Sequence, residues 1–255
     1  MRPQITGTTL PVLEIGLDAG EMIIAAPGEL AWMTPNLRMN TTTATAGTAS
    51  LWGAVTRAIS GGGLFMTEFV ADNGPGGVAF APQIPGQIVS VDVQPGRGFL
   101  IHRHGFLCAT QGVELTTGLQ RSLGAGIFGG EGFILQHLAG TCQAWVALGG
   151  EIVSNELQPG ESLLVHPGHV GMFEDSVQFD ITTISGIKNA LFGGDGIFLV
   201  RLTGPGRVWL QSMTLPNLAH ALAPYLPRNE AVSTAQGVEA GAAGAIMRGI
   251  FSGER

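Results

Sequence analysis

Residues 157–172, LQPGESLLVHPGHVGM, occur in three recognisable versions along the chain. The other two versions are LDAGEMIIAAPGELAWM, which begins at Leu17, and VQPGRGFLIHRHGFLCAT, which begins at Val93. Each version contains a glycine where one short apolar segment turns into the next, and these glycines are Gly20, Gly96 and Gly160. A block that recurs in this way predicts a body built from repeated structural units.

A second block follows each of the first blocks. It reads GGGLF from Gly61, GGEGFILQHLAGTCQAW from Gly129 and GGDGIFLVRLTGPGRVW from Gly193. Gly96 lies 64 residues before Gly160, which is also the offset between the GGEG and GGDG blocks. Because two unlike blocks keep the same offset, we expect a duplicated unit, with repeats at about residues 13–85, 86–150 and 151–213.

The composition favours an all-β fold. The chain has 255 residues, of which 40 are glycine, 45% are hydrophobic and 12% are charged. Disorder requires low hydrophobicity and high charge, so short strands joined by tight turns fit this composition better. All-β sandwiches and barrels often reach about 200–250 residues as a single domain. We therefore expect one body over residues 1–226, built from three tandem β-sandwich or short double-stranded β-helix-like repeats.

Short apolar segments bounded by glycine and proline predict the strands. In the second and third repeats the expected strand pairs are 99–102 with 106–110, 132–138 with 143–148, 162–166 with 170–173, and 196–202 with 207–212. Glycines in the turns tolerate positive φ, so we expect hairpin connections at residues 73–76, 139–141 and 203–206.

Three segments depart from the strand pattern. Residues 40–60 are first threonine-rich and then apolar, and they are expected to form a short helix or a loop. Residues 215–226 have apolar side chains at helical spacing between Pro216 and Pro227, which predicts a helix. Residues 227–255 are an Ala- and Gly-rich C-terminal tail, in which residues 242–251 are either a weak helix that packs on a neighbouring subunit or part of a mobile tail.

Charge and hydropathy limit the classes of partner. A net charge of −7 and a pI near 5.3 argue against nucleic acid, which proteins bind with clustered Lys and Arg. A mean hydropathy of +0.30 leaves little polar surface for a monomer, so we expect self-association. The N-terminus lacks an apolar signal region and no apolar run approaches about 20 residues, so we expect no membrane span and a cytoplasmic location. Cys108 and Cys142 lack CxxC spacing and are expected to be buried free thiols.

The run His102-Arg103-His104 matches the start of the cupin metal motif, in which two histidines lie on one face of a strand. A cupin then needs a Glu four or five residues further on, where this chain has Cys108 and Ala109. A late histidine is available at His166 or His169, but His102 and His166 hold equivalent repeat positions, so only a subunit interface would bring them together. Two hypotheses therefore remain for this run, namely a metal site or histidines of a turn or surface.

Glu131 and Asp195 occupy equivalent positions in the GGEG and GGDG blocks. A catalytic carboxylate pair is conceivable there, but a carboxylate that accepts backbone N–H bonds within a glycine-rich turn is the favoured interpretation. The sequence contains no GxSxG, P-loop, GxGxxG or HExxH motif. These motifs therefore identify no catalytic or cofactor-binding residue.

Taken together, several of these motifs resemble the family of altered inheritance of mitochondria protein 24, from about Leu13 to Leu226. The motifs that carry the resemblance are the turn at Gly160-Glu161, the turn at Pro167-Gly168-His169, the FGGEG and FGGDG blocks at Phe128 and Phe192, and LTGPGRVWLQS from Leu202. The resemblance implies three repeats similar to the subunit of the tryptophan RNA-binding attenuation protein, assembled as trimers into rings, with no catalytic residues. RNA binding is not expected to accompany this fold, because fold alone does not carry function and the charge is negative.

The second repeat departs from the pattern by one extra residue between Gly96 and Gly105, which brings in His104. We expect a non-enzymatic oligomeric scaffold or binding protein, a homotrimer without a cofactor, whose protein or small-molecule partner is not identified. The alternative is a cupin-like metal-dependent enzyme that uses His102 and His104. A third possibility is a small-ligand binder with clefts between its repeats.

Overall fold

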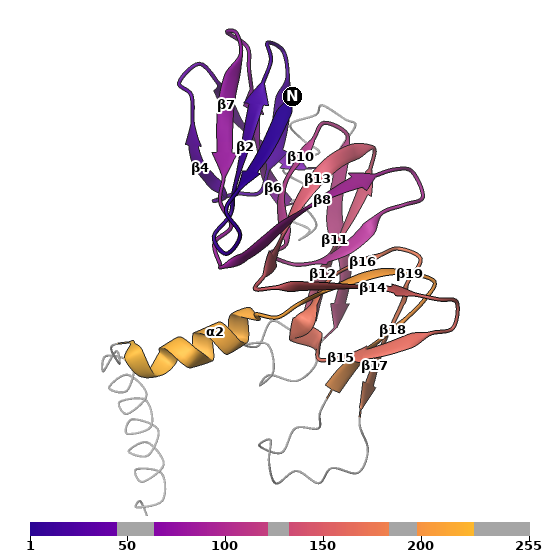
Figure 1. The fold of residues 1–255 in the computed structure, drawn as a ribbon. Coiled ribbons are helices and arrows are strands. Elements are labelled where there is room, and N and C mark those ends of the chain that lie inside the picture. Colours follow the sequence, from indigo (N-terminus) through magenta and orange to yellow (C-terminus); the bar gives the residue numbers. More distant parts are fainter. Residues whose placement is uncertain (45–63, 122–132, 184–197, 227–255) are drawn as a thin grey trace, which may run out of the picture. The chain divides into compact units, whose positions relative to one another are not determined.

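The computed structural model describes residues 1–44, 64–121, 133–183 and 198–226 (Figure 1). The chain divides into two compact units, Met1–Asn217 and Leu218–Arg255. The described elements of the first unit are almost all β-strands, which confirms the all-β expectation. Of residues 40–60, which were expected to form a short helix or a loop, 40–44 belong instead to a β-strand, and 45–60 lie outside the described residues, as does segment 242–251.

Six strands recur in the same order in each repeat, after the N-terminal strand β1 (Arg2–Thr6). The first repeat contains β2 (Val12–Leu17), β3 (Met22–Ala25), β4 (Leu30–Met33), β5 (Arg38–Ala44), β6 (Leu64–Val70) and β7 (Gly76–Phe80). The second contains β8 (Gly86–Val93), β9 (Phe99–His102), β10 (Phe106–Thr110), β11 (Val113–Arg121), β12 (Phe133–Gly140) and β13 (Cys142–Gly149). The third contains β14 (Ile152–Leu157), β15 (Ser162–Val165), the 3-10 turn η1 (Pro167–His169), β16 (Val170–Glu174), β17 (Gln178–Thr183), β18 (Phe198–Thr203) and β19 (Gly206–Gln211).

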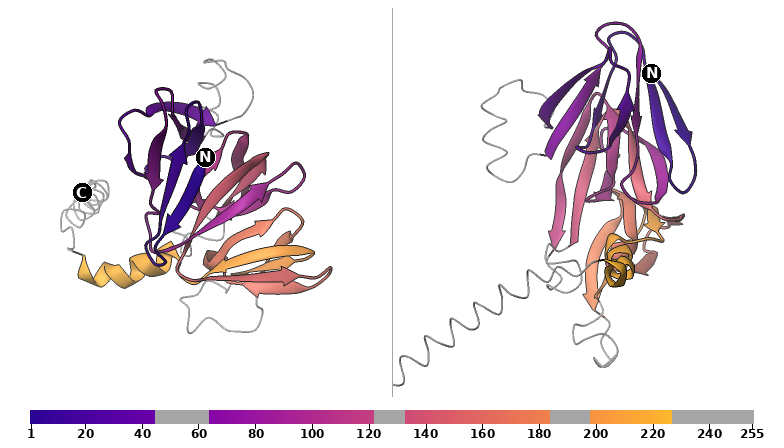
Figure 2. Two further views of the ribbon diagram at one scale, coloured as in Figure 1. Left: turned by 45° about the horizontal axis from the view of Figure 1, so that its top comes forward. Right: turned by 90° about the vertical axis from the view of Figure 1, so that its left-hand side faces the viewer.

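The strands of each repeat lie in two sheets. The first, sixth and third strands form one sheet in that order, as in β8-β13-β10, and the fourth, fifth and second form the other, as in β11-β12-β9. All described pairings are antiparallel, and Figure 2 shows these strands coloured from indigo in the first repeat to orange in the third. Within a repeat, the fourth and fifth strands follow each other in the chain and also pair with each other. No other two consecutive strands of a repeat pair among the described strands.

The predicted hairpin pairings are therefore wrong. The two strands of each predicted pair belong to different sheets, and so do β6 and β7 on either side of the turn at residues 73–76. The predicted pairs are β9 with β10, β12 with β13, β15 with β16, and β18 with β19. The chain crosses from one sheet to the other because each strand has an apolar face that is buried against the facing sheet. Glycines allow the tight turns at these crossings, because they adopt positive φ without steric cost. Gly140 has φ 105°, and the block glycines Gly20, Gly96 and Gly160 have φ 85°, 75° and 81°.

Neighbouring repeats share a sheet at two equivalent joints. At each joint the second strand of one repeat pairs with the third strand of the next, so that β3 pairs with β10 and β9 pairs with β16. The register is also equivalent, because Cys108 lies opposite Ala25 and Met172 lies opposite Ile101. The resulting six-stranded sheets are β5-β6-β3-β10-β13-β8 and β11-β12-β9-β16-β19-β14.

The apolar core also continues across the joints. Leu107, Cys108 and Trp145 of the second repeat pack with the core of the first, and Phe133 of the second packs with the core of the third. Each large side chain buried in this way contributes about 1.5–3 kcal/mol relative to its exposed state. Residues of neighbouring repeats thus share apolar cores within the unit Met1–Asn217.

A helix, α2 (Leu215–Leu222), follows the last strand, and a 3-10 turn, η2 (Ala223–Tyr225), follows the helix. The helix predicted at residues 215–226 is therefore present, but its α-helical part ends at Leu222. Pro224 has no backbone N–H to continue the α-helical hydrogen bonds, and the chain passes into the 3-10 turn η2 at this point. None of the helices in the described ranges is long and apolar enough to cross a membrane.

Candidate functional site

The His102-Arg103-His104 run spans the end of β9 and the turn that follows it. Strand β9 ends at His102, and Arg103 and His104 belong to the turn that leads to Gly105. The two imidazoles therefore do not lie on one face of one strand, as the cupin pattern requires. The extra residue expected in the second repeat is absent from the structure, because this turn is as long as its counterpart in the third repeat: the Gly105 N–H donates to the His102 carbonyl oxygen as the His169 N–H donates to that of His166.

Backbone groups occupy both ring nitrogens of His102. Its Nδ1 accepts a hydrogen bond from the His104 backbone N–H at 3.3 Å, and its Nε2 lies 3.3 Å from the carbonyl oxygen of Ala147. This pattern fits a neutral imidazole with its proton on Nε2. Burial lowers the pKa of His102 to about 4 from 6.5, so the ring is neutral at pH 7.

The later histidines have partners of their own. His169 Nδ1 lies 2.8 Å from the carbonyl oxygen of Gln211, and the rings of His166 and His169 meet edge to face at 5.7 Å. Burial, and then the nearby His169, lower the pKa of His166. Within the described ranges, no group of three or more His, Cys, Asp or Glu side chains is close enough to hold a metal ion. The carboxylates Glu131 and Asp195 lie outside those ranges.

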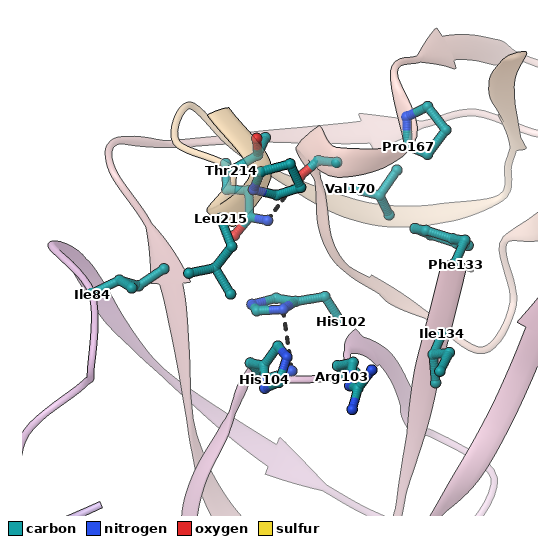
Figure 3. Close-up of a pocket in the computed structure, with 13 residues that line it drawn as sticks. Ile84, His102, Arg103, His104, Phe133, Ile134, Pro167, Val170, Thr214 and Leu215 are labelled. Carbon is teal, nitrogen blue, oxygen red and sulfur yellow. Dashed lines mark hydrogen bonds between the residues drawn. The ribbon is translucent and has the colours of Figure 1, made fainter. Parts of the chain in front are cut away.

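Two adjoining cavities flank this turn. A cavity of about 170 Å³ lies between the second and third repeats, and His102 and His104 line it together with Pro167 and Val170 (Figure 3). A second cavity of about 250 Å³, which we call the joint cavity, lies between the first and second repeats. Four residues line both cavities, namely Ile84, Arg103, His104 and Leu215.

The joint cavity combines an apolar wall with several polar groups. Its apolar lining includes Met66, Phe106 and Leu115, and its polar lining includes Glu29 and Gln136. Burial raises the pKa of Glu29 to about 7 from 4.5, although the hydrogen bond from Gln83 opposes the shift. Among the described residues, Gln136 Oε1 is the buried side-chain oxygen or nitrogen atom that has no hydrogen-bond partner.

Two strands form open edges that correspond to the internal joints. Strand β4 is the third strand of the first repeat and ends the sheet β1-β2-β7-β4. Strand β15 is the second strand of the third repeat and ends the sheet β15-β18-β17. Each occupies the position whose counterparts pair across a joint, and neither has a second neighbour among the described strands.

Apolar side chains of these edges are exposed where their counterparts are buried. Trp32 on β4 is 53% exposed, whereas Cys108 and Met172 at the equivalent position are fully buried. On β15, Leu164 is 49% exposed, and its counterpart Leu100 is partly buried. An exposed apolar edge strand is a ready template for pairing with another chain.

Strand β4 also has the shape of the paired strands. Its pairing with β7 shifts register between Leu30 and Trp32, and the equivalent shifts lie between Phe106 and Cys108 and between Val170 and Met172. A bulge of this kind increases the local twist of a strand. Strand β4 therefore has the same local distortion as the strands that form the internal joints.

Both cysteines are buried and free, as the sequence predicts. Burial raises the pKa of Cys142 to about 11 and that of Cys108 well above its usual value, with the nearby Glu29 as the smaller cause for Cys108. Both side chains are therefore neutral thiols at pH 7, and nucleophilic chemistry, which needs a thiolate, is not their role.

Three repeats of a six-stranded sandwich, joined through shared sheets, define a protein of the repeated all-β class. The chain belongs to the family described as mitochondrial biogenesis AIM24, whose model matches residues 3–213. The family resemblance seen in the sequence motifs is thus confirmed.

Two similar proteins come from Streptococcus pyogenes. An uncharacterised protein of serotype M6 is 26% identical over 220 residues, which cover 85% of this chain and 87% of that protein. The X-ray crystal structure of the protein SPYM3_0169 matches with a TM-score of 0.69 and 26% identity, and the match covers 88% of this chain and 99% of that chain. These relatives support the fold over nearly the whole length of the chain.

Sequence reasoning missed the polar groups of the joint cavity. Glu29 stands in a turn after Pro27-Gly28, where a carboxylate normally faces water. Gln136 gave a clearer signal, because it is a polar residue at a core-facing position of the apolar segment FILQHL. The open edges gave no signal, since β4 is as apolar in sequence as its buried counterparts.

Proposed function

We propose that this protein is a non-enzymatic oligomeric scaffold or binding protein, whose copies assemble head to tail through β4 of one copy and β15 of the next. The observation that carries the proposal is the equivalence between these two open edges and the two internal joints. A contact between copies would repeat the internal joint and bury Trp32 and Leu164.

The internal joints also specify a register. Cys108 lies opposite Ala25 and Ala109 lies opposite Ile24. By repeat equivalence, Trp32 of one copy lies opposite Val165 of the next, and Met33 lies opposite Leu164. Pairing of aromatic and β-branched or aliphatic side chains contributes about 0.2–1 kcal/mol for each cross-strand pair, in addition to the burial of apolar area.

A head-to-tail contact is heterologous, so it produces a closed ring or an open fibre. We propose closure with three copies, a homotrimer, because the motif resemblance implies trimeric rings. Closure also agrees with the apolar character of the chain, whose mean hydropathy is +0.30, because a ring covers the exposed apolar side chains of both β4 and β15.

The location and the class of partner follow from chemistry. We propose a cytoplasmic location, supported by the two free thiols, because reducing compartments keep cysteines unpaired. We also propose that the partner is a protein or a small molecule and not a nucleic acid, because the net charge is −7. Cell fractionation and salt-dependent binding assays with RNA and DNA test these two points.

Cysteine cross-linking tests the edge contact. We expect the double variant Trp32→Cys, Val165→Cys to form covalent trimers under mild oxidation, because the two thiols face each other between copies. Each single variant should remain monomeric on a non-reducing gel. The pair Ile5→Cys, Val165→Cys is a matched control, because Ile5 is exposed but lies on β1. Covalent dimers of the Trp32→Cys single variant would instead indicate that β4 of one copy pairs with β4 of another, and would contradict the proposal.

A further inference from the structure

We propose that the joint cavity binds a small organic amine, with its apolar body against Met66, Phe106 and Leu115 and its ammonium group beside Glu29 and Gln136. The cavity is formed by the first and second repeats of a single chain. The inference therefore does not depend on assembly between copies, and either proposal can fail without the other.

The size and lining of the cavity suit a fragment-sized molecule. Its volume of about 250 Å³ lies just below the range of about 300–1,000 Å³ that is typical of drug-sized ligands. Met66, Phe106 and Leu115 are 1%, 4% and 3% exposed, so this wall is an extension of the core. Pro82, Ile84 and Leu215 add further apolar lining. A planar ring or a short alkyl chain fits these walls.

Two side chains that line the cavity carry hydrogen-bond acceptors. Gln136 is 92% buried, being 8% exposed, and its Oε1 accepts no hydrogen bond from the described residues. Leaving such an acceptor unpaired costs about 1–3 kcal/mol. Because this oxygen is itself buried, a donor in the cavity reaches it once the Gln136 side chain turns toward the cavity that the residue lines. The carboxylate of Glu29 is likewise an acceptor, and its side-chain partner among the described residues is Gln83.

The charge of Glu29 favours an amine over an anion. Glu29 is half-buried, and no described ion pair includes it. Desolvation without a countercharge raises the pKa of its carboxyl to about 7. An ammonium group supplies that countercharge, whereas a carboxylate or phosphate would have to lie next to Glu29 and be repelled by it.

Other titratable and charged groups face the same space. Arg103 and His104 line the cavity, and Arg103 already has an interaction partner of its own. Burial and the charge of Arg103 lower the pKa of His104, so its imidazole is neutral at pH 7. The Cys108 thiol lies near Glu29 and is protonated. Glu29 is therefore the lining group whose charge changes between pH 6 and pH 8.

Titration of the full-length protein with benzylamine, followed by NMR chemical shifts and calorimetry, tests the proposal. Benzyl alcohol and toluene are matched probes with a neutral donor and with none. We expect benzylamine to bind more tightly than both, and about five- to tenfold more tightly at pH 8 than at pH 6, because ionised Glu29 is the binding form. The Glu29→Gln variant should weaken binding about tenfold at pH 8 and remove the pH dependence.

Two further variants keep the result interpretable. Gln136→Leu should weaken benzylamine binding about five- to tenfold at both pH values, since it removes the buried acceptor. Glu14→Gln is the control, because Glu14 is an exposed carboxylate on β2, and it should change nothing. Unfolding curves of each variant verify that it is folded. Equal affinity for the wild type and the folded Glu29→Gln variant, or no binding by the wild type, would overturn the proposal.

Discussion

His102 holds its ring between two backbone groups, the His104 N–H and the Ala147 carbonyl. A metal ligand needs a free ring nitrogen, so this geometry opposes the cupin-like alternative for His102 and His104. We predict no near-stoichiometric metal in untagged protein purified without added metal or chelator, as measured by elemental analysis. Metal that is present in the wild type and lost in a His102→Ala, His104→Ala variant would instead support the enzyme hypothesis.

Glu29 gives a prediction about stability and pH. Its folded pKa of about 7 lies above 4.5, the value of an unperturbed carboxyl, so the folded state binds the proton more tightly. The charge therefore costs nothing below about pH 4.5, and stability is lost as the pH rises toward 7 and above. We expect Glu29→Gln to raise the unfolding free energy by about 1 kcal/mol at pH 8, after allowance for partial exposure, and by much less at pH 5.

Urea unfolding at the two pH values measures this difference. The Glu14→Gln variant is again the matched control, since Glu14 is exposed. A Glu29→Gln variant that is no more stable than the wild type at pH 8 would mean that the carboxylate is well solvated.

At the scale of elements, the open edges β4 and β15 give the next prediction. Lysine at Trp32 or Leu164 places a charge in the proposed contact, and edge lysines oppose strand pairing. We expect Trp32→Lys and Leu164→Lys each to weaken assembly at least tenfold. A tenfold change needs only about 1.4 kcal/mol, and burial of the Trp32 side chain in the contact contributes more than that. Sedimentation velocity over a concentration series measures the effect.

The control for the lysine variants is Val153→Lys. Val153 is 57% exposed and lies on β14, which ends a different sheet. Its substitution should leave the oligomer unchanged. If Val153→Lys disrupts assembly while the variants on β4 and β15 do not, the contact lies on another edge.

Element positions were more predictable from the sequence than element pairings. The bounds of β9 and β10 match residues 99–102 and 106–110, because glycines and a charged turn delimit them. The predicted pairings were wrong because strand periodicity shows which side chains face the core. It does not show whether the next strand lies beside the first in the same sheet or opposite it in the other sheet. The fifth strands contact the second and fourth strands of their own repeat, a choice made by the sandwich as a whole.

Some residues of the candidate sites were not predictable for a related reason. Trp32 and Cys108 occupy the same position in two repeats, but one is exposed and the other is buried, because only the second has a neighbouring repeat on that side. The joint cavity depends on side chains from two repeats, so Glu29 and Gln136 line the same space only after folding. The sequence of a single repeat therefore predicts neither the exposure of Trp32 nor the joint cavity.

At the scale of the whole molecule, the three repeats form a series with two unlike ends. Each internal joint covers the edge of the second strand of one repeat and the edge of the third strand of the next. Among the described strands, the third strand β4 and the second strand β15 have no such partner. We propose that copies join through this pair. A ring of three copies would give every such edge a partner.

The native mass of the full-length wild type in solution tests this claim most directly. Light scattering coupled to size exclusion should give three times the chain mass of 26.4 kDa, without change over a tenfold dilution. A clean monomer of 26.4 kDa at all concentrations would contradict the head-to-tail assembly and leave β4 and β15 as edges without a partner.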